Sequence, residues 1–130
     1  MLKLFKSNTF YVRMFINCIE INHINTEKSI KQKSIIPFSN ERLLLADFIV
    51  AENFLTSLIN EVQSRRSSPT FTLSSEILFQ PMEKTEGGIS PVERRAYFDL
   101  CEHVGGKKVK LYDQLDMLSN TEVTNLMGSF

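Results

Sequence analysis

Cysteine is scarce in this chain, and no sign of charge is in excess. Cys18 and Cys101 are the only two cysteines, too few for the disulfide framework of a small secreted domain. Lys plus Arg and Asp plus Glu number 15 each, so no global field favours nucleic acid or an anionic membrane. No apolar run approaches the roughly 20 residues that a membrane-spanning helix needs. The sequence therefore predicts a reduced, cytoplasmic protein with no membrane span and no nucleic-acid partner.

The amino-terminal segment lacks the features of a secretory leader. Residues 1–6 are basic and apolar, but this stretch is too short and no small-residue cleavage site follows it. The composition, 42% hydrophobic and 23% charged, is that of an ordinary globular protein. We expect residues 1–114 to form one domain and residues 115–130 to form a tail, in which Asn120 caps a short helix that reaches Met127.

The first half of the chain reads as an antiparallel meander followed by a helix. Aromatic and β-branched residues predict strands over residues 10–15 and 19–24, joined by a tip at Asn17 and Cys18. After a polar turn, a third strand is expected over residues 29–36, where Pro37 ends it. Residues 47–63 carry a broad apolar face at helical spacing, and Asp47 is a good cap for that helix.

The second half reads as strand, loop, helix and strand. A strand is expected over residues 71–79 and should end at Pro81. Ser90 and Glu93 form the pattern of a capping box, and Gly105 with Gly106 predicts the end of the helix that follows. Residues 109–111 alternate as a last strand. One apolar stripe of the helix is expected to face the sheet and consists of Val92, Ala96, Leu100 and Val104.

This order of elements predicts a fold class. Three antiparallel strands are followed by helix, strand, helix and strand, and helical crossovers imply that the later strands run parallel. The pattern therefore favours an α/β domain, a ribonuclease-H-like sandwich.

Two sequence blocks resemble the bacterial actins, in particular the rod-shape-determining, MreB-like family. Residues 90–96 read SPVERRA and residues 105–112 read GGKKVKLY, similar to a helix start and the following strand in that family. Upstream, residues 46–52 read ADFIVAE, similar to a third family segment. The resemblance implies the first subdomain of an actin-like ATPase and covers roughly half of the chain. That subdomain has the same order of strands and helices as the one predicted above.

The nucleotide site of that family is not preserved. Actin-like ATPases hold phosphate with a hairpin that reads D-x-G-T, and residues 12–17, VRMFIN, lie over it. No Asp, Gly or Thr remains there, and large side chains stand where phosphate must approach the backbone. We therefore expect this chain to have the fold of that subdomain without its ATPase activity, and to bind no cofactor and no nucleotide.

Other catalytic or metal sites are not predicted either. A ribonuclease-H-like nuclease needs clustered carboxylates for two metal ions, but Glu52 and Glu76 have no partner on the first strand. We interpret both as solvated surface carboxylates. The spacing of the possible metal ligands fits no zinc pattern; these are Cys18, His23, Cys101 and His103.

Two segments are candidates for interaction. The loop 82–88 is longer than in the resembled family and either braces neighbouring loops, recognises a partner or simply connects two elements. Gly87 and Gly88 precede a helix start that favours anions, but Glu83 and Glu86 oppose this. The apolar tail should cover the sheet, in the same chain or in a second one. The candidate residues are Glu83, Lys84, Thr85, Glu86, Gly87, Gly88, Leu126, Met127 and Phe130.

The hypothesis is a non-catalytic, MreB-like scaffold or adaptor that binds a protein partner, and the resemblance implies a link to cell-shape or envelope machinery. We expect the hairpin over residues 10–21 to offer a sheet edge with few charges, which favours a homodimer. The alternative is an enzyme or small-ligand-binding protein with an unrecognised pocket. An exposed apolar patch favours the binding protein, whereas clustered buried polar groups with perturbed protonation favour the enzyme.

Overall fold

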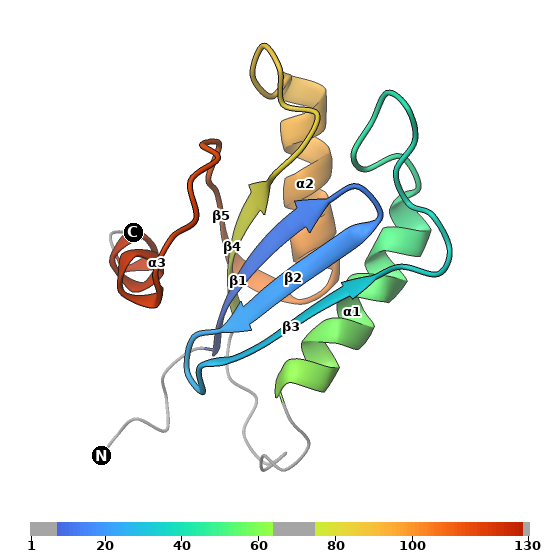
Figure 1. Ribbon diagram of the computed structural model, residues 1–130. Coiled ribbons are helices and arrows are strands. Elements are labelled where there is room, and N and C mark those ends of the chain that lie inside the picture. Colours follow the sequence, from blue (N-terminus) through green and yellow to red (C-terminus); the bar gives the residue numbers. More distant parts are fainter. Residues whose placement is uncertain (1–7, 64–74, 129–130) are drawn as a thin grey trace, which may run out of the picture.

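A computed structural model describes residues 8–63 and 75–128 of the chain. These residues form one mixed, five-stranded sheet with helices on both faces (Figure 1). The strands are β1 (Asn8–Phe15), β2 (Cys18–His23), β3 (Lys28–Lys33), β4 (Ser75–Pro81) and β5 (Gly106–Leu111). The helices are α1 (Phe48–Gln63), α2 (Pro91–His103) and α3 (Asn120–Met127). None of the helices in the described ranges has the length and hydrophobicity to cross a membrane.

The strand order is β3-β2-β1-β4-β5, with β1 at the centre. β1, β2 and β3 form an antiparallel meander, while β1, β4 and β5 run parallel to one another. The two parallel steps contain α1 and α2, as helical crossovers require. The predicted order of elements and strand directions is therefore confirmed.

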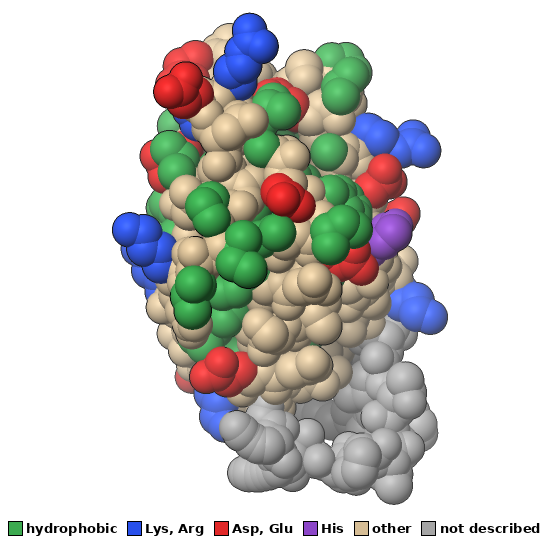
Figure 2. All heavy atoms as spheres, turned by 90° about the vertical axis from the view of Figure 1, so that its right-hand side faces the viewer, with side chains coloured by type: hydrophobic (Ala, Val, Ile, Leu, Met, Phe, Trp, Pro, Cys, Tyr) green, Lys and Arg blue, Asp and Glu red, His purple; other side chains and the backbone are tan. Residues whose placement is uncertain are grey.

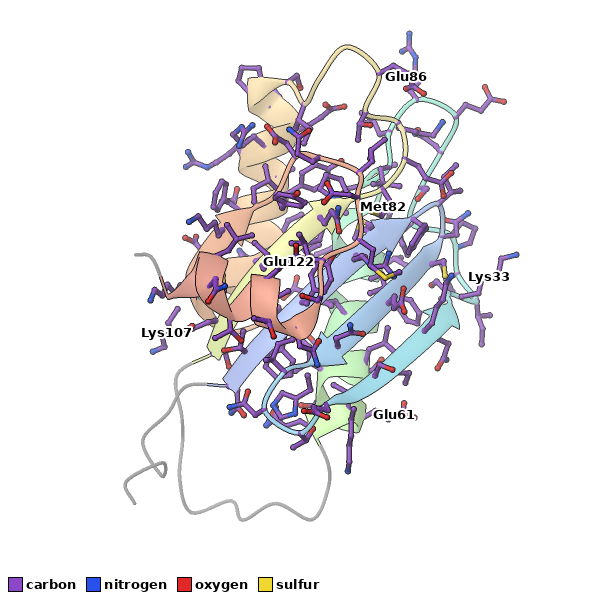
Figure 3. All side chains as sticks on the ribbon, turned by 60° about the vertical axis from the view of Figure 1, so that its left-hand side comes forward. Lys33, Glu61, Met82, Glu86, Lys107 and Glu122 are labelled. Carbon is purple, nitrogen blue, oxygen red and sulfur yellow. The ribbon has the colours of Figure 1, made fainter. Side chains whose placement is uncertain are left out.

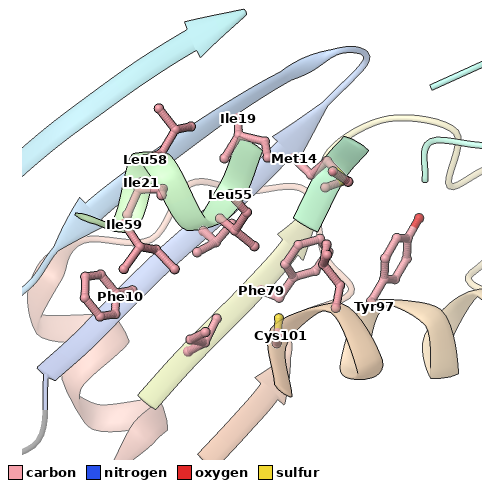
Figure 4. Packing of buried hydrophobic residues seen from close by; sticks show 14 of the residues in the cluster. Phe10, Met14, Ile19, Ile21, Leu55, Leu58, Ile59, Phe79, Tyr97 and Cys101 are labelled. Carbon is pink, nitrogen blue, oxygen red and sulfur yellow. The ribbon is translucent and has the colours of Figure 1, made fainter. Parts of the chain in front are cut away.

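One face of the sheet forms the main core with α1 and α2 (Figure 4). Phe10, Val12 and Met14 alternate along β1 toward this face and are fully buried. The intervening Tyr11 is also buried, because the opposite face of this central strand is covered as well. Leu55 of α1 is fully buried and belongs to the same cluster.

The opposite face is covered by α3, which lies across the sheet from the other two helices (Figure 3). Tyr11 and Leu78 of the sheet pack there against Leu118, Val123 and Met127 of the tail. The apolar tail thus covers its own chain. The sequence alone left open whether the tail covers the sheet of its own chain or that of a second chain.

The buried side of α2 differs from the predicted stripe. Leu100 is fully buried, but Val92 is 78% exposed. Tyr97 and Cys101 are buried instead. The ring of Tyr97 lies 5.0 Å from that of Phe79, centroid to centroid, so this bulky side chain fills the space beside the sheet. The prediction that Val92 faces the sheet is wrong.

Local hydrogen bonds explain how two strands end, one of them earlier than predicted. β3 stops at Lys33, not at residue 36, because the Ser34 hydroxyl donates to the Ile36 carbonyl at 2.6 Å and turns the backbone. β4 ends at Pro81, as predicted. The next amide, of Met82, donates to the Met14 carbonyl at 2.8 Å, so pairing with β1 continues past the proline.

The ends of α2 and the start of α3 show how the sequence sets boundaries. The Ser90–Glu93 capping box is confirmed in both of its hydrogen bonds. α3 has a second capping box, but its cap is Ser119 rather than Asn120. After α2, Gly105 has a φ of +112°, a conformation that favours glycine, and β5 therefore begins as early as Gly106. The expected strand residues 71–74 lie outside the described ranges.

The amino-terminal hairpin is not a sheet edge. β2 pairs with β3 on one side, and β1 pairs with β4 on the other. The expectation that residues 10–21 offer an exposed edge is therefore wrong. Dimerisation itself stays a prediction, but it needs another surface.

Candidate functional site

The loops at the carboxyl ends of β1 and β4 occupy the position where α/β sheets usually bind ligands. These parallel strands end side by side, since Met14 lies opposite Pro81. Ligands of open α/β sheets bind in crevices outside the carboxyl ends of such strands. Here the hairpin tip, the loop 34–47 and the loop 82–90 gather at this end of the molecule (Figure 1).

Asn17 at the hairpin tip holds the loop that precedes α1. Its φ of +52° belongs to the left-handed region that asparagine tolerates. Its side-chain Oδ1 accepts from the amides of Phe38 and Ser39 at 2.9 and 2.8 Å. Its own amide donates to the Ser39 hydroxyl at 3.0 Å. The hairpin tip is therefore occupied by contacts within the protein.

The loop 82–88 is tied to the same two neighbours. Glu83 accepts from the Ile16 amide through Oε2 at 2.9 Å, and Lys84 Nζ donates to the Glu41 carbonyl at 2.7 Å. The Gly88 amide donates to the Thr85 carbonyl at 2.9 Å. These contacts give the loop a bracing role. Recognition by Glu83, Lys84, Thr85, Glu86, Gly87 and Gly88 stays a prediction.

The tail residues of the candidate list are separated from that loop. Met127 is buried and Leu126 half-buried in the cluster beneath α3, on a face of the sheet away from the loop ends (Figure 3). Phe130 lies outside the described residues. The structure thus places the two predicted groups apart, and they form no common site.

A buried polar network fastens the tail to the sheet. The Tyr11 hydroxyl donates to Gln80 Oε1 and accepts from the Leu118 amide. Gln80 Nε2 donates to the carbonyls of Gln114 and Asp116, both at 2.8 Å. Burial raises the pKa of Tyr11, which keeps the donating hydroxyl protonated. Throughout the described ranges every buried side-chain nitrogen and oxygen has a hydrogen-bond partner, so this network is structural.

The remaining titratable groups do not form a catalytic cluster. Arg13 is paired with Glu20 on the facing strand. Burial raises the pKa of the Cys101 thiol well above its usual range, and a protonated thiol is a poor nucleophile. Glu52 lies 3.6 Å from His103 Nδ1. Within residues 8–63 and 75–128, no group of three or more side chains is placed to hold a metal ion.

His23 gives the fold a pH dependence. Its ring nitrogens contact Thr26 Oγ1 and Asn8 Oδ1 at 2.9 and 3.0 Å, and its ring stacks on Phe10. Burial, with a smaller contribution from Lys28, lowers the pKa of His23 below 6.5. Below pH 6.5 the unfolded chain therefore takes up a proton that the folded chain resists, and stability falls.

We expect the contribution of His23 to the free energy of unfolding to be complete above pH 6.5 and to decrease as the pH falls below 6.5. His23→Gln should flatten that decrease, because the titrating group is gone. His103→Gln, at an exposed position of α2, should retain it. Urea unfolding at a series of pH values measures the effect. An equal slope in the wild type and His23→Gln would contradict it.

A groove between the end of β3 and α1, called here the α1–β3 groove, is the main exposed apolar feature. Its cavity volume is about 310 Å³. Ile35 is 96% exposed and Ile36 61%. Figure 2 shows this side of the molecule, where hydrophobic side chains gather and charged ones lie mainly toward the rim. The lining residues are Gln32, Lys33, Ser34, Ile35, Ile36, Val50, Asn53, Phe54 and Ser57.

The exposed side of α1 extends this surface with few charges. α1 contains no Lys or Arg, and Ile49 is 63% exposed. Its other exposed positions are neutral except Glu61; they are Asn53, Thr56, Ser57 and Asn60. By contrast, α2 carries Glu93, Arg94, Arg95, Asp99 and Glu102.

Two further large cavities lie along α2. The first, of about 360 Å³, is lined by Arg95, Phe98, Asp99 and Glu102. The second, of about 370 Å³, lies between α2 and β5. Its lining holds no carboxylate, histidine, serine or cysteine that would serve as a nucleophile or base. The lining residues are Arg94, Phe98, Val109, Lys110 and Leu111.

Sequence reasoning missed the α1–β3 groove. It placed Ile35 and Ile36 inside the third strand and therefore did not predict that their side chains are exposed. Two adjacent isoleucines break the alternation of a half-buried strand, and this was the available signal. The absence of basic residues from α1 was a second.

Comparison with known proteins finds a similarity along most of the chain. No protein family matches this chain. Over 118 residues it is 29% identical to the "Uncharacterized protein YjaA" of Escherichia coli (strain K12), and the match covers 89% of each chain. Neither finding points to a bacterial actin. Along most of its length, this chain is similar to a protein that is described only as uncharacterized.

Proposed function

We propose that this chain is a non-catalytic protein-binding domain, an MreB-like scaffold or adaptor that acts in the cytoplasm. The exposed α1–β3 groove is the observation that supports this most strongly. Contiguous exposed apolar surface on a folded domain marks interaction sites, and depletion of charged residues is typical of interface centres. Both features occur together on α1 and the segment after β3.

The strand order agrees with an actin-like scaffold. A ribonuclease-H-like sandwich, like the first subdomain of actin-like proteins, has β1 at the centre, an antiparallel meander on one side and parallel strands on the other. The resembling blocks fall at the start of α1, at the start of α2 and along β5. A link with cell shape or envelope machinery rests on this resemblance alone and is an analogy.

The hairpin argues against an ATPase. Where an actin-like protein would use hairpin amides for phosphate, the Ile16 amide already donates to the Glu83 carboxylate. A phosphate there would have to displace a negative side chain and overcome its repulsion. The scaffold is therefore proposed without its nucleotide.

We expect ATP with magnesium not to bind. Titration calorimetry at millimolar ATP should show no saturable heat, because Glu83 fills the anion position and the hairpin has no glycine or threonine. Glu83→Gln should not restore binding, since Arg13, Met14 and Phe15 remain. A dissociation constant in the micromolar range would overturn the proposal and favour an ATPase.

The alternative of an enzyme or small-ligand-binding protein has less support. The buried polar groups around Tyr11 and Gln80 are used to hold the tail. The cavity between α2 and β5 lacks a nucleophile with a base. Tyr97 combines a pocket with perturbed protonation, since it lines a cavity of about 70 Å³ and burial raises its pKa to about 12. A tyrosine that stays protonated at neutral pH is not a general base, so this position adds little support for catalysis.

Capture from native lysate tests the proposal with matched variants. The bait is the full chain as wild type, Ile36→Asp and Val92→Asp. Both positions are exposed isoleucine or valine, but only Ile36 lies in the α1–β3 groove. A specific partner should be retained by wild type and Val92→Asp and lost with Ile36→Asp. A partner that binds all three equally would show that the groove is not the binding surface.

A further inference from the structure

β3 is an edge strand of the sheet, and its charge is of one sign. No strand of the described ranges pairs with its outer side. Its sequence, KSIKQK, carries Lys28, Lys31 and Lys33 and no acidic residue. An open edge is a template for another strand, and lysines on it oppose neutral or basic strands while attracting acidic ones.

Acidic side chains near β3 do not cancel this charge. Glu20 on β2 is paired with Arg13. Glu27 precedes the strand, and Glu61 lies in the last turn of α1. The three lysines of β3 outnumber these two carboxylates, so the strand and its end, where the α1–β3 groove begins, keep a net positive charge.

The other sheet edge makes self-pairing unfavourable. β5 reads GKKVKL, with Lys107, Lys108 and Lys110. A β3–β3 contact between two copies would set lysine against lysine, and like charges on facing strands are destabilising. In a β3–β5 contact Lys107 would oppose the lysines of β3, while Lys108 is already paired with Glu76. The edge of β3 therefore favours a strand without lysines, and the edge strands of a second copy of this chain do not meet that requirement.

The α1–β3 groove would receive one side of an added strand. Alternate side chains of a strand point to the same face. Beside β3, one such face lies over Val50 and Phe54 of α1, next to Ile35 and Ile36. Apolar side chains on that face of the guest would fill the groove, and acidic ones elsewhere would meet the lysines.

We propose that the partner contributes an extended segment, acidic with alternating apolar residues, which adds to the outer edge of β3 and fills the α1–β3 groove. This inference rests on the proposed function and specifies its partner. Main-chain hydrogen bonds to β3 supply affinity in this mode, and side-chain pockets supply selectivity.

Selection from a random twelve-residue peptide library displayed on phage, with the full chain immobilised, tests the inference. Enriched peptides should be acidic with alternating apolar positions. Their binding, measured by fluorescence polarisation, should weaken about tenfold or more for Lys28→Glu with Lys33→Glu, since reversed charges repel the guest. Ile36→Asp should abolish it. Lys107→Glu on β5 is the matched control and should have no effect.

The variants also separate the two proposals. Lys31 is left unchanged because it faces Glu20 in the β2–β3 register and its ammonium lies 4.8 Å from the centroid of the Phe15 ring. Circular dichroism of each variant verifies that it is folded. Peptides without acidic bias that still require Ile36 would overturn the acidic partner but retain the protein-binding groove. No enrichment, or binding that survives Ile36→Asp, would overturn both.

Discussion

Leu100→Ala is expected to lower the free energy of unfolding by about 2–5 kcal/mol. Leu100 is fully buried on α2 and belongs to the main core. Truncation removes apolar contact and leaves a cavity, and Tyr97 and Cys101 beside it are themselves buried. Urea unfolding at neutral pH measures the change.

Two substitutions on the same helix serve as controls. Val92→Ala should change the unfolding free energy little, because Val92 is 78% exposed. Ser90→Ala should cost about 0.5–2 kcal/mol, since the Glu93 amide loses its capping oxygen. The observed packing of α2 would be wrong if Val92→Ala or Ser90→Ala proved more destabilising than Leu100→Ala.

Tyr11→Phe is expected to cost about 1–3 kcal/mol, the penalty for leaving buried polar groups unpaired. The substitution keeps the ring but removes the hydroxyl that joins Gln80 on β4 to the Leu118 amide in the tail. The packing beneath α3 remains, so the loss reports on the network. Urea unfolding gives the total effect, and hydrogen exchange of residues 120–127 shows whether α3 opens locally.

Tyr112→Phe is the matched control for this prediction. Its hydroxyl also donates to a tail residue, to Asp116 Oδ1 at 2.8 Å, but at an exposed position. Water can replace that bond, and little stability should be lost. Equal effects of Tyr11→Phe and Tyr112→Phe, with unchanged exchange of α3, would show that the buried network does not hold the tail.

The order of elements could be predicted because its signals are local. The capping box at Ser90 and Glu93 involves residues three apart, and the glycine pair after α2 acts within one turn. The alternation of apolar residues along β1 and their helical spacing along α1 could be recognised in the same way. Caps, glycine stops and periodic patterns depend on residues that are close together in the sequence, so they can be recognised without the structure.

Faces and edges were predicted less well because they depend on contacts distant in sequence. Which side of α2 is buried depends on Tyr97 meeting Phe79. That the hairpin is internal depends on β4 pairing with β1 across more than half the chain. The tail cover depends on Gln80 and Tyr11, neither of which carries a sequence signal for that role.

The α1–β3 groove was not predicted, for a similar reason. Loop 82–88 was conspicuous by its length and glycines, yet Glu83 and Lys84 brace the neighbouring loops. Ile35 and Ile36 were absorbed into a strand that ends three residues earlier. Only the turn at Ser34 exposes them.

Amide hydrogen exchange of the chain bound to a captured partner or selected peptide tests the protein-binding proposal most directly. Binding at the α1–β3 groove should protect residues 28–36 and the amino-terminal turns of α1, and leave loop 82–88 and α3 unchanged. The free Ile36→Asp variant, mixed with the same partner, should show no protection. Protection confined to loop 82–88, to β5 or to α3 would contradict the proposed surface.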